Sequence, residues 1–333
     1  MKQIFWIAAV LLLFGGCSGK KYFEPAQVLK PAGALSGHKG HEVYVTRNGV
    51  TFDNGTYISH RGPGRVALGL NKHYLGESPS YIIVANGAGK LSLISKKSKK
   101  VVHTVNFDAP VVSAAIKNGK IVYLLQDNAF GIYRISNKEK LIENKSEDAF
   151  AVDARIASPI FVDNLAVIPT LDGKLLILDM QNPENARVIY VSSKSKLNNI
   201  IFLSRVGNTL VAATPSRIMI IGSAEAEVTE GISEVSIANH AIYVFTKSGE
   251  IIKYSSTLKQ LARKKFKFAH FSAATAFGGR VYGLDQQGSL IVLNSALTKK
   301  RIYDVGEVKD YAFVSGHRIY KDNMVITLDK LRP

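Results

Sequence analysis

The sequence predicts an all-β fold, a β-propeller of four-stranded blades, with eight blades favoured and seven as the alternative. Three observations lead to this prediction. A hairpin of two apolar runs recurs along the chain, its copies are spaced by about 40 residues, and strand-like segments without helical periodicity flank them. Helical repeats of similar length need a 3.6-residue period, which is absent here.

The clearest hairpin spans Asp163 to Met180. Its apolar runs, Leu165 to Ile168 and Leu175 to Leu178, flank a turn at Asp172-Gly173. An Asp-Gly pair between two such runs is a strong hairpin signal. Both runs are apolar on both faces, as in a strand covered on two sides. One hairpin cannot bury two apolar faces alone, so copies are expected to pack against each other.

Copies of this hairpin follow one another along the chain. Their steps range from 33 to 44 residues, which is the length of a propeller blade. The eight hairpins are Glu42 to Phe52, Tyr81 to Ile94, Ile121 to Ile135, Asp163 to Met180, Thr209 to Ile221, Ala241 to Tyr254, Val281 to Leu293 and Arg318 to Leu328.

Flanking segments complete four strands per blade. Val111 to Ile116 precedes one hairpin, and Val101 to Phe107 follows another. The chain ends at Pro333, soon after the last hairpin, so the last blade lacks an outer strand. We expect an N-terminal segment to supply that strand and close the ring, which removes the open edges. If Glu42 to Phe52 is the closing segment, the count is seven.

The first residues resemble an export signal. Lys2 precedes the apolar run Ile4 to Phe14, and Gly15-Gly16 precedes Cys17, the single cysteine. These features predict a signal peptide over 1–16 that is too short to span a bilayer. The pattern resembles a bacterial lipoprotein signal, although Phe14 and Gly15 are unusual there. The resemblance implies that Cys17 carries the lipid, palmitate included. The alternative is an ordinary signal peptide followed by a chance cysteine.

These boundaries divide the chain into three parts. Residues 1–16 are the expected lipoprotein signal peptide, residues 17–41 are the lipidated cysteine and a flexible tether, and residues 42–333 are the β-propeller. The tether is rich in Lys, Gly, Ala, Pro and Ser. Ser18 follows the lipid position, and a residue other than Asp there favours the outer membrane in enteric sorting. The expected location is therefore the periplasmic side of a bacterial outer membrane.

The composition is that of a basic globular protein. The chain is 46% hydrophobic and 21% charged, with a net charge of +17. This charge favours anionic partners such as lipid headgroups, polysaccharide or an acidic protein face. Export makes nucleic acid an unexpected partner. The densest basic runs are Lys96 to Lys100 and Arg263 to Lys267, which are expected to be solvated loop charges.

No motif for catalysis, cofactor binding or metal binding is recognised, so we predict no enzyme activity and no cofactor. His38 and His41 have a metal-ligand spacing but no acidic or cysteine partner nearby, so solvated loop histidines are favoured. Acidic residues recur at the hairpin turns, where Asp suits the turn itself. A pair of them could also converge at the central channel. These residues are Asp53, Asp127, Asp172, Asp285 and Asp322.

The repeat resembles that of quinoprotein-type (PQQ-like repeat) β-propellers. The run from Asp172 to Asp179, with Asp-Gly followed by an apolar strand ending in Leu-Asp, carries the resemblance, and Gly288 to Asn294 is a second copy. The tryptophan that docks blade on blade in that family is absent after the signal peptide. Other aromatic residues are expected to replace it. The candidates are Phe107, Tyr190, Phe266 and Tyr303.

The resemblance implies a function. Lipoprotein members of this family without enzyme residues are eight-bladed scaffolds that dock on the periplasmic domains of the outer-membrane β-barrel insertase. We therefore expect a scaffold that supports barrel-protein assembly. The alternative is an envelope or surface binder of anionic polysaccharide or protein, similar to an adhesin. A quinone-cofactor dehydrogenase is disfavoured, because such enzymes are longer and use a calcium site, a vicinal cysteine pair in many members, and tryptophan.

Overall fold

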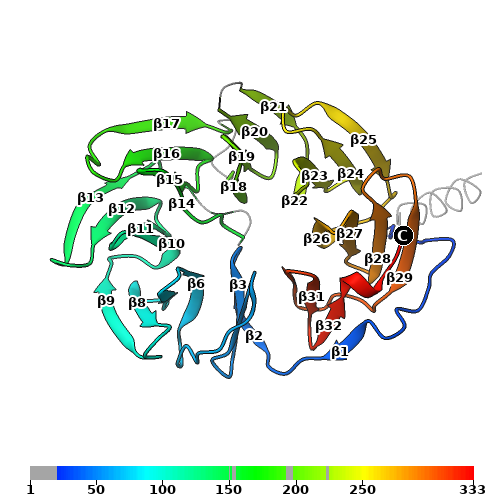
Figure 1. The fold of residues 1–333 in the computed structure, drawn as a ribbon, viewed down its shortest axis with the longest axis horizontal. Helices are drawn as coiled ribbons and strands as arrows, with labels where there is room; N and C mark the ends of the chain where they lie inside the picture. Colours follow the sequence, from blue (N-terminus) through cyan, green and yellow to red (C-terminus); the bar gives the residue numbers. More distant parts are fainter. Residues whose placement is uncertain (1–20, 150, 152–154, 193–197, 223–224) are drawn as a thin grey trace, which may run out of the picture.

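The computed structural model describes residues 21–149, 151, 155–192, 198–222 and 225–333. In this part of the chain the strands form eight four-stranded antiparallel sheets. The sheets stand around a central axis as the blades of a ring (Figure 1). The predicted β-propeller is confirmed, and the number of blades is eight.

The first four blades follow the chain without interruption. In blades 2 to 4, the first strand lies nearest the axis and the fourth lies at the rim (Figure 1). Blade 1 consists of β2 (Glu42–Val45), β3 (Gly49–Phe52), β4 (Tyr57–Ser59) and β5 (Gly62–Pro63); blade 2 of β6 (His73–Glu77), β7 (Tyr81–Ala85), β8 (Lys90–Ser95) and β9 (Val101–Asn106); blade 3 of β10 (Val111–Lys117), β11 (Lys120–Leu125), β12 (Ala129–Arg134) and β13 (Glu139–Lys145); blade 4 of β14 (Ile160–Val162), β15 (Leu165–Pro169), β16 (Lys174–Asp179) and β17 (Ala186–Tyr190).

The last four blades repeat the pattern, except that the final blade takes its fourth strand from the N-terminal part of the chain. Blade 5 consists of β18 (Phe202–Val206), β19 (Thr209–Ala213), β20 (Arg217–Ile221) and β21 (Ala226–Thr229); blade 6 of β22 (Ile232–Ala238), β23 (Ala241–Thr246), β24 (Glu250–Tyr254) and β25 (Gln260–Lys265); blade 7 of β26 (Phe271–Phe277), β27 (Arg280–Asp285), β28 (Ser289–Asn294) and β29 (Lys300–Asp304); blade 8 of β30 (Ala312–Ser315), β31 (Arg318–Lys321), β32 (Met324–Thr327) and β1 (Leu35–Gly37). The short 3₁₀ helix η1 (Leu328–Lys330) follows β32.

All eight predicted hairpins are present. In seven blades the hairpin forms the second and third strands, which are covered by neighbouring blades on both faces. The exception is Glu42 to Phe52, which forms the first and second strands of blade 1. Its place differs because blade 1 has short outer strands, β4 and β5, that carry no long apolar run.

The glycine in several hairpin turns is required by geometry. Gly173 has φ +82°, and a Cβ atom there would lie 2.6 Å from the Ser192 carbonyl oxygen. Gly249 in blade 6 has φ +80°, and its Cβ atom would lie 2.2 Å from the Phe266 carbonyl oxygen. In both blades the chain leaving the outer strand crosses directly over the turn. The Asp-Gly and Ser-Gly turns therefore serve both the turn conformation and the passage of the outer strand.

We expect Gly249→Ala to lower the free energy of unfolding by about 2 kcal/mol, because the methyl group meets backbone as well as an unfavourable φ. Gly119→Ala is the matched control. Gly119 has φ +70° but open space around its Cβ position, so this change is expected to cost about 1 kcal/mol. Urea unfolding of both variants measures the difference. Equal losses would show that the crossing chain imposes no constraint on the turn.

The ring closes through β1. This strand pairs antiparallel with β32, with Ser36 opposite Val325. His38 then stacks edge-on against Phe52 of blade 1, with ring centroids 4.6 Å apart, and against Tyr320 of blade 8 at 5.7 Å. The expectation that an N-terminal segment supplies the missing strand is confirmed. The blade count stays at eight because Glu42 to Phe52 is not the closing segment.

This closure places part of the expected tether within the propeller. The sequence predicts a flexible tether over residues 17–41, yet Leu35–Gly37 is a strand and Ala34 is only 1% exposed. A three-residue strand of Leu, Ser and Gly has no hydrophobic period from which it could be recognised. The structured body therefore begins before residue 42. The predicted signal peptide 1–16 and Cys17 lie outside the described residues.

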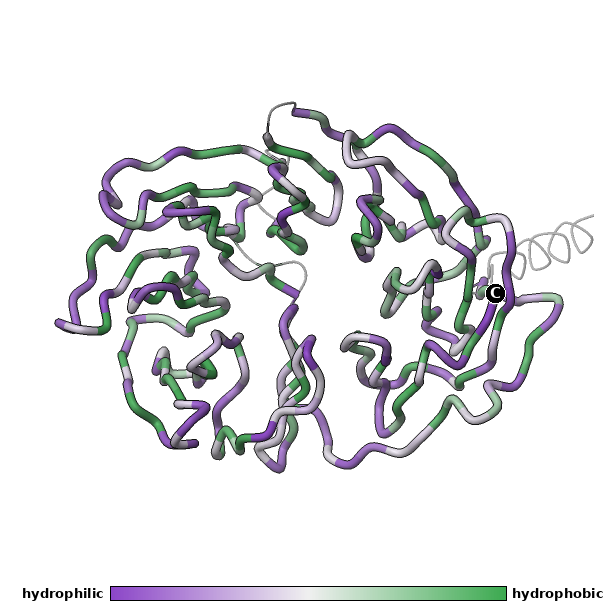
Figure 2. The backbone as a smooth tube through the Cα atoms, viewed as in Figure 1, coloured by the Kyte–Doolittle hydropathy of each residue, from purple (hydrophilic) through white to green (hydrophobic). Residues whose placement is uncertain are grey.

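The hydrophobic core lies between adjacent blades. In Figure 2 the hydrophobic stretches run through the blades and hydrophilic segments concentrate at turns and the rim. Phe107 of blade 2 lies 4.2 Å from the Tyr123 ring of blade 3, and Phe266 and Tyr303 are buried between later blades. These three aromatic residues take the docking position, as predicted. The prediction is wrong for Tyr190, which is 56% exposed because it lies on the outer strand β17.

A buried histidine makes the fold sensitive to acid. His73 in β6 stacks on Tyr44 of blade 1 with centroids 3.8 Å apart, and its Nε2 atom has no hydrogen-bond partner. Burial lowers the pKa of His73 from 6.5 to about 4. The unfolded chain therefore takes up this proton at higher pH than the folded chain. The stability that the neutral ring provides is complete above about pH 6.5 and is lost as the pH falls toward 4.

We expect wild-type protein to lose about 2 kcal/mol of unfolding free energy from this group between pH 7.5 and pH 5. Replacing the ring by a neutral amide, His73→Gln, removes the titration and should flatten that part of the pH profile. Urea unfolding at a series of pH values measures it. A His73→Gln profile parallel to the wild-type profile would contradict the assignment.

Candidate functional site: the central channel

The innermost strands of the blades surround a central channel. A cavity of about 560 Å³ is lined by residues of blades 1 and 4 to 8, and a second cavity of about 260 Å³ adjoins it beside blades 1 to 3. The two cavities share Asn48, His60, Ser158 and Ile160. Among the described residues this is the place where side chains from most blades meet, so it is the first candidate for a functional site.

The carboxylate of Glu234 links two arginines, Arg47 and Arg155, across the channel. Glu234 comes from β22 of blade 6 and is 8% exposed. Its Oε1 atom lies 2.5 Å from Nη2 of Arg47, in the turn after β2, and its Oε2 atom lies 3.3 Å from Nη1 of Arg155, ahead of β14. Arg47 also donates to the Val235 carbonyl at 3.4 Å and lies over the Phe202 ring at 5.4 Å.

Neighbouring polar groups extend these links to other blades. Asn48 Nδ2 donates to the Leu75 carbonyl of blade 2 at 2.7 Å and to Ser158 Oγ at 2.5 Å. The two ring nitrogens of His60 face the carbonyl oxygens of Arg47, at 2.7 Å, and Val314, at 3.1 Å. The polar groups of the channel are thus engaged with one another across blades 1, 2, 4, 6 and 8. Their geometry holds the ring together, with the carboxylate of Glu234 shared by the guanidiniums of Arg47 and Arg155.

The acidic turn residues do not converge at the channel. They lie at hairpin turns or their ends and accept local hydrogen bonds. Asp285 is 1% exposed and accepts from the backbone N–H groups of His270, at 2.7 Å, and Gln287, at 2.9 Å. Burial raises the pKa of Asp285, although these donors oppose the rise. The other four are Asp53, Asp127, Asp172 and Asp322, with partners His41, Ala129, Lys174 and Lys309.

The structural interpretation of these aspartates agrees with the sequence analysis. The Asp172 carboxylate lies 2.7 Å from Lys174 Nζ and accepts from Ser146 Oγ at 2.8 Å. His38 packs between aromatic rings and His41 is exposed. Within the described ranges, no group of three or more His, Cys, Asp or Glu side chains is arranged to hold a metal ion. Cys17, the predicted lipid site, lies outside those ranges.

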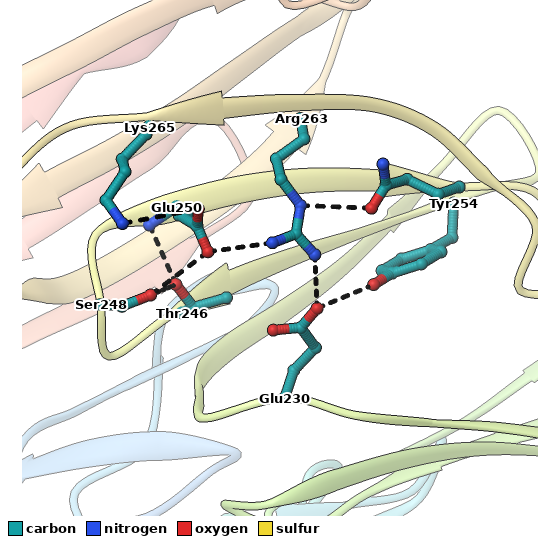
Figure 3. Close-up of polar contacts among 8 residues, drawn as sticks. Glu230, Thr246, Ser248, Glu250, Tyr254, Arg263 and Lys265 are labelled. Carbon is teal, nitrogen blue, oxygen red and sulfur yellow. Dashed lines mark hydrogen bonds and ion pairs between the residues drawn. The ribbon is translucent and has the colours of Figure 1, made fainter.

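The two basic runs have different surroundings. Lys96 forms an ion pair with Glu77 at 2.6 Å, whereas Lys97, Lys99 and Lys100 are exposed in the β8–β9 turn. In blade 6, Arg263 bridges Glu230, at 2.6 Å, and Glu250, at 3.2 Å (Figure 3). The expectation of solvated loop charge is therefore correct for Lys97, Lys99 and Lys100. It is wrong for Lys96 and Arg263, which form ion pairs.

The network in Figure 3 also includes a second basic residue, Lys265. Lys265 lies 3.8 Å from Glu250, and Tyr254 donates to Glu230 at 3.3 Å. These contacts join two strands, β24 and β25, to the segment that enters blade 6. Glu230 and Glu250 neutralise much of the charge that the sequence places at positions 263 and 265.

The sequence pattern does not identify Arg47, Arg155 or Glu234 as site residues. Glu234 has one visible signal, a carboxylate inside the apolar segment Ile232–Ala238. A charged residue in an innermost strand must have a partner, but nothing local identifies an arginine 187 positions earlier. Through the described part of the chain, no helix has the length and apolar character needed to cross a bilayer.

The sequence is similar to one protein family model and to two curated proteins. The sequence model of the family described as "Outer membrane protein assembly factor BamB" matches residues 65–230, which include all the strands of blades 2 to 5. Two curated relatives are plasminogen-binding proteins PgbB from two strains of Helicobacter pylori. The protein of strain J99 is 26% identical over 369 aligned residues, covering 96% of this chain and 68% of that protein. The second strain gives 26% over 367 residues.

Solved structures agree on the architecture. BamB from Moraxella catarrhalis superposes with a TM-score of 0.65 at 14% identity, covering 87% of this chain and 98% of that one. The C-terminal WD40 domain of Sif2 gives a TM-score of 0.63 at 13% identity, covering 90% and 99%. Because identities this low show the fold alone, the repeat type comes from the family match. The chain is an eight-bladed β-propeller similar to BamB in fold, and its residues 65–230 match the PQQ-type repeats of that family.

Proposed function

We propose that this protein is a non-enzymatic scaffold lipoprotein on the periplasmic side of a bacterial outer membrane. It supports the assembly and insertion of β-barrel proteins by binding the periplasmic domains of the insertase. The match of residues 65–230 to the family described as an outer membrane protein assembly factor carries this proposal. A lipid on Cys17 would keep the propeller at the membrane where its partners work.

The geometry of the ring supports a binding role. The polar side chains of the channel are joined to one another, from Arg47 through Glu234 to Arg155. The surface offered to a partner then consists of turns and outer strands carried on a closed, rigid ring. Such surfaces suit protein–protein contacts, through loops or by strand addition at an edge.

A deletion strain tests the assembly role. We expect the amounts of folded β-barrel proteins in the outer membrane to fall in the deletion strain and to recover with the wild-type gene. A Cys17→Ala form, which cannot take the lipid, should restore them poorly despite equal protein levels. Unchanged barrel-protein amounts in the deletion strain would contradict the assembly role.

A second candidate function follows from the curated relatives. PgbB is named a plasminogen-binding protein, and the similarity covers 96% of this chain. We therefore propose, as the alternative, a surface binder of host protein, for which the +17 net charge suits an acidic partner face. Intact cells distinguish the two. Binding of plasminogen to cells, lost on deletion and on protease treatment of intact cells, would favour the surface binder. Protection from protease on intact cells favours the periplasmic scaffold.

A further inference from the structure

The N-terminal strap, residues 21–37, is bound along the rim of the propeller. The Phe23 ring lies edge-on to Phe266 of blade 6 with centroids 5.8 Å apart. Leu29 forms a parallel bridge with Tyr303, with its N–H donating to the Ile302 carbonyl at 2.9 Å. β1 then joins blade 8. In Figure 1 this blue segment passes outside β29 and reaches β32. The strap therefore fixes Lys21 at the rim between blades 6 and 7.

Lysines and phenylalanines meet at the start of the strap. The ammonium groups of Lys21 and Lys267 lie 5.7 Å and 5.0 Å from the centroid of the Phe268 ring. That of Lys300 lies 5.9 Å from the Phe266 centroid. Cation–π contacts of this length hold the ammonium groups at the ring faces. We call Lys21, Lys267, Lys300 and Phe268 the rim patch; the Phe266 ring beneath Lys300 is buried.

The charges of the rim patch are not neutralised by the protein. Its three lysines are exposed, and no ion pair within the described ranges joins them to a carboxylate. The contrast with the adjoining network is direct, because Arg263 and Lys265 in the preceding strand are paired with Glu230 and Glu250 (Figure 3). The three lysines of the rim patch therefore keep their positive charge without a carboxylate partner among the described residues.

Phe268 is held at the surface in an unusual conformation. Its φ is +68°, a left-handed value that is rare for a bulky aromatic residue, and the side chain is half-buried between the two lysines. Backbone strain of this kind persists where the surrounding structure imposes it, and it gathers at functional surfaces. A partly exposed aromatic ring flanked by lysines matches the chemistry of a lipid headgroup layer, which accepts both.

The distance to the expected lipid anchor is short. Four peptide steps separate Cys17 from Lys21, which span at most about 14 Å when fully extended. That is close to the Debye length of about 10 Å at moderate salt, within which lysines attract anionic lipids. A lipid on Cys17 therefore holds the rim patch near the bilayer surface.

We propose that the rim patch docks on anionic phospholipid headgroups and turns the rim of blades 6 and 7 toward the membrane. This rests on the proposed lipid anchor at Cys17. The lipid anchor holds the chain at the bilayer, and a basic patch adds an electrostatic contact that determines which side of the propeller faces the headgroups. Lipid is favoured over an acidic protein as the occupant because the patch is continuous with the strap that leads to the anchor.

Vesicle binding tests the patch. The full chain carrying Cys17→Ala removes the lipid contribution, and Lys21→Glu, Lys267→Glu and Lys300→Glu are added together. On phosphatidylethanolamine vesicles containing phosphatidylglycerol, the triple variant should bind at least about 100-fold more weakly than its parent. The matched control reverses Lys97, Lys99 and Lys100, which are exposed in blade 2, and should change binding by less than about threefold. Thermal unfolding of each variant confirms that it is folded.

Each outcome is decisive. Loss confined to the rim-patch variant, and absent with neutral phosphatidylcholine vesicles, supports the proposal. Equal losses in both triple variants would show unspecific charge attraction and overturn it. Unchanged vesicle binding together with lost recovery of a protein partner would make the patch a protein site and would also overturn it. Mass spectrometry of the N-terminal peptide of the wild-type protein reports lipidation of Cys17 separately, so failure of the anchor is distinguished from failure of the patch.

Discussion

Proline at position 36 is expected to lower the free energy of unfolding by about 3 kcal/mol. Ser36 is the middle residue of β1 and lies opposite Val325. The flanking bonds, His38 N–H to the Asn323 carbonyl and Thr327 N–H to the Ala34 carbonyl, both 2.8 Å long, place Ser36 in the hydrogen-bonded register. Proline removes the amide that this register needs.

Ser36→Ala is the matched control, because it keeps the amide and alters only an exposed side chain. It should change the unfolding free energy by less than about 0.5 kcal/mol. Urea unfolding compares the two variants. In Ser36→Pro, blade 8 loses its outer strand and the edge of β32 is left open, so limited proteolysis should cut first near the strap. If Ser36→Pro were as stable as Ser36→Ala, β1 would not be the closure of the ring.

Removal of the channel carboxylate is the second large effect. Glu234→Ala should cost about 3 kcal/mol, because it leaves the guanidiniums of Arg47 and Arg155 without their shared carboxylate in a largely buried site. The side chains of Arg47 and Glu234 are 17% and 11% exposed, so solvent can replace little of the lost interaction.

Glu227→Ala provides the control for this ion pair. Glu227 lies 2.7 Å from Arg217, but its side chain is 46% exposed, and such a pair contributes less than about 1 kcal/mol. Urea unfolding of the two variants at neutral pH measures the difference. A loss for Glu234→Ala no larger than that for Glu227→Ala would mean that the Arg47–Glu234–Arg155 link does not stabilise the ring.

The hairpins were predictable because their signals are local. Asp172-Gly173 lies between two apolar runs, and the turn glycine is required both by its φ of +82° and by the crossing chain. The repeat spacing then determines the architecture, since a hairpin that is apolar on both faces needs a neighbour on each side. The blade-docking aromatics were only partly predictable. Phe107 is buried, whereas Tyr190 is exposed, because composition does not reveal the face on which a ring lies.

The closing strand and the channel depend on contacts between distant residues. Leu35–Gly37 is too short to show a hydrophobic period, and it is ordered by β32 near the other end of the chain. Arg47, Arg155 and Glu234 come from three blades and meet only when the ring is closed. The only local sign of these contacts in the sequence is Glu234, a carboxylate within the apolar strand Ile232–Ala238.

Recovery of partners from membranes tests the scaffold role most directly. The full-length protein with its native signal is purified from detergent-solubilised membranes, beside its Cys17→Ala form, and the bound proteins are identified by mass spectrometry. The scaffold role predicts that barrel-assembly components are recovered with the wild-type protein and are depleted in the Cys17→Ala sample. Recovery of surface polysaccharide or of added plasminogen, without any barrel-assembly component, would contradict it.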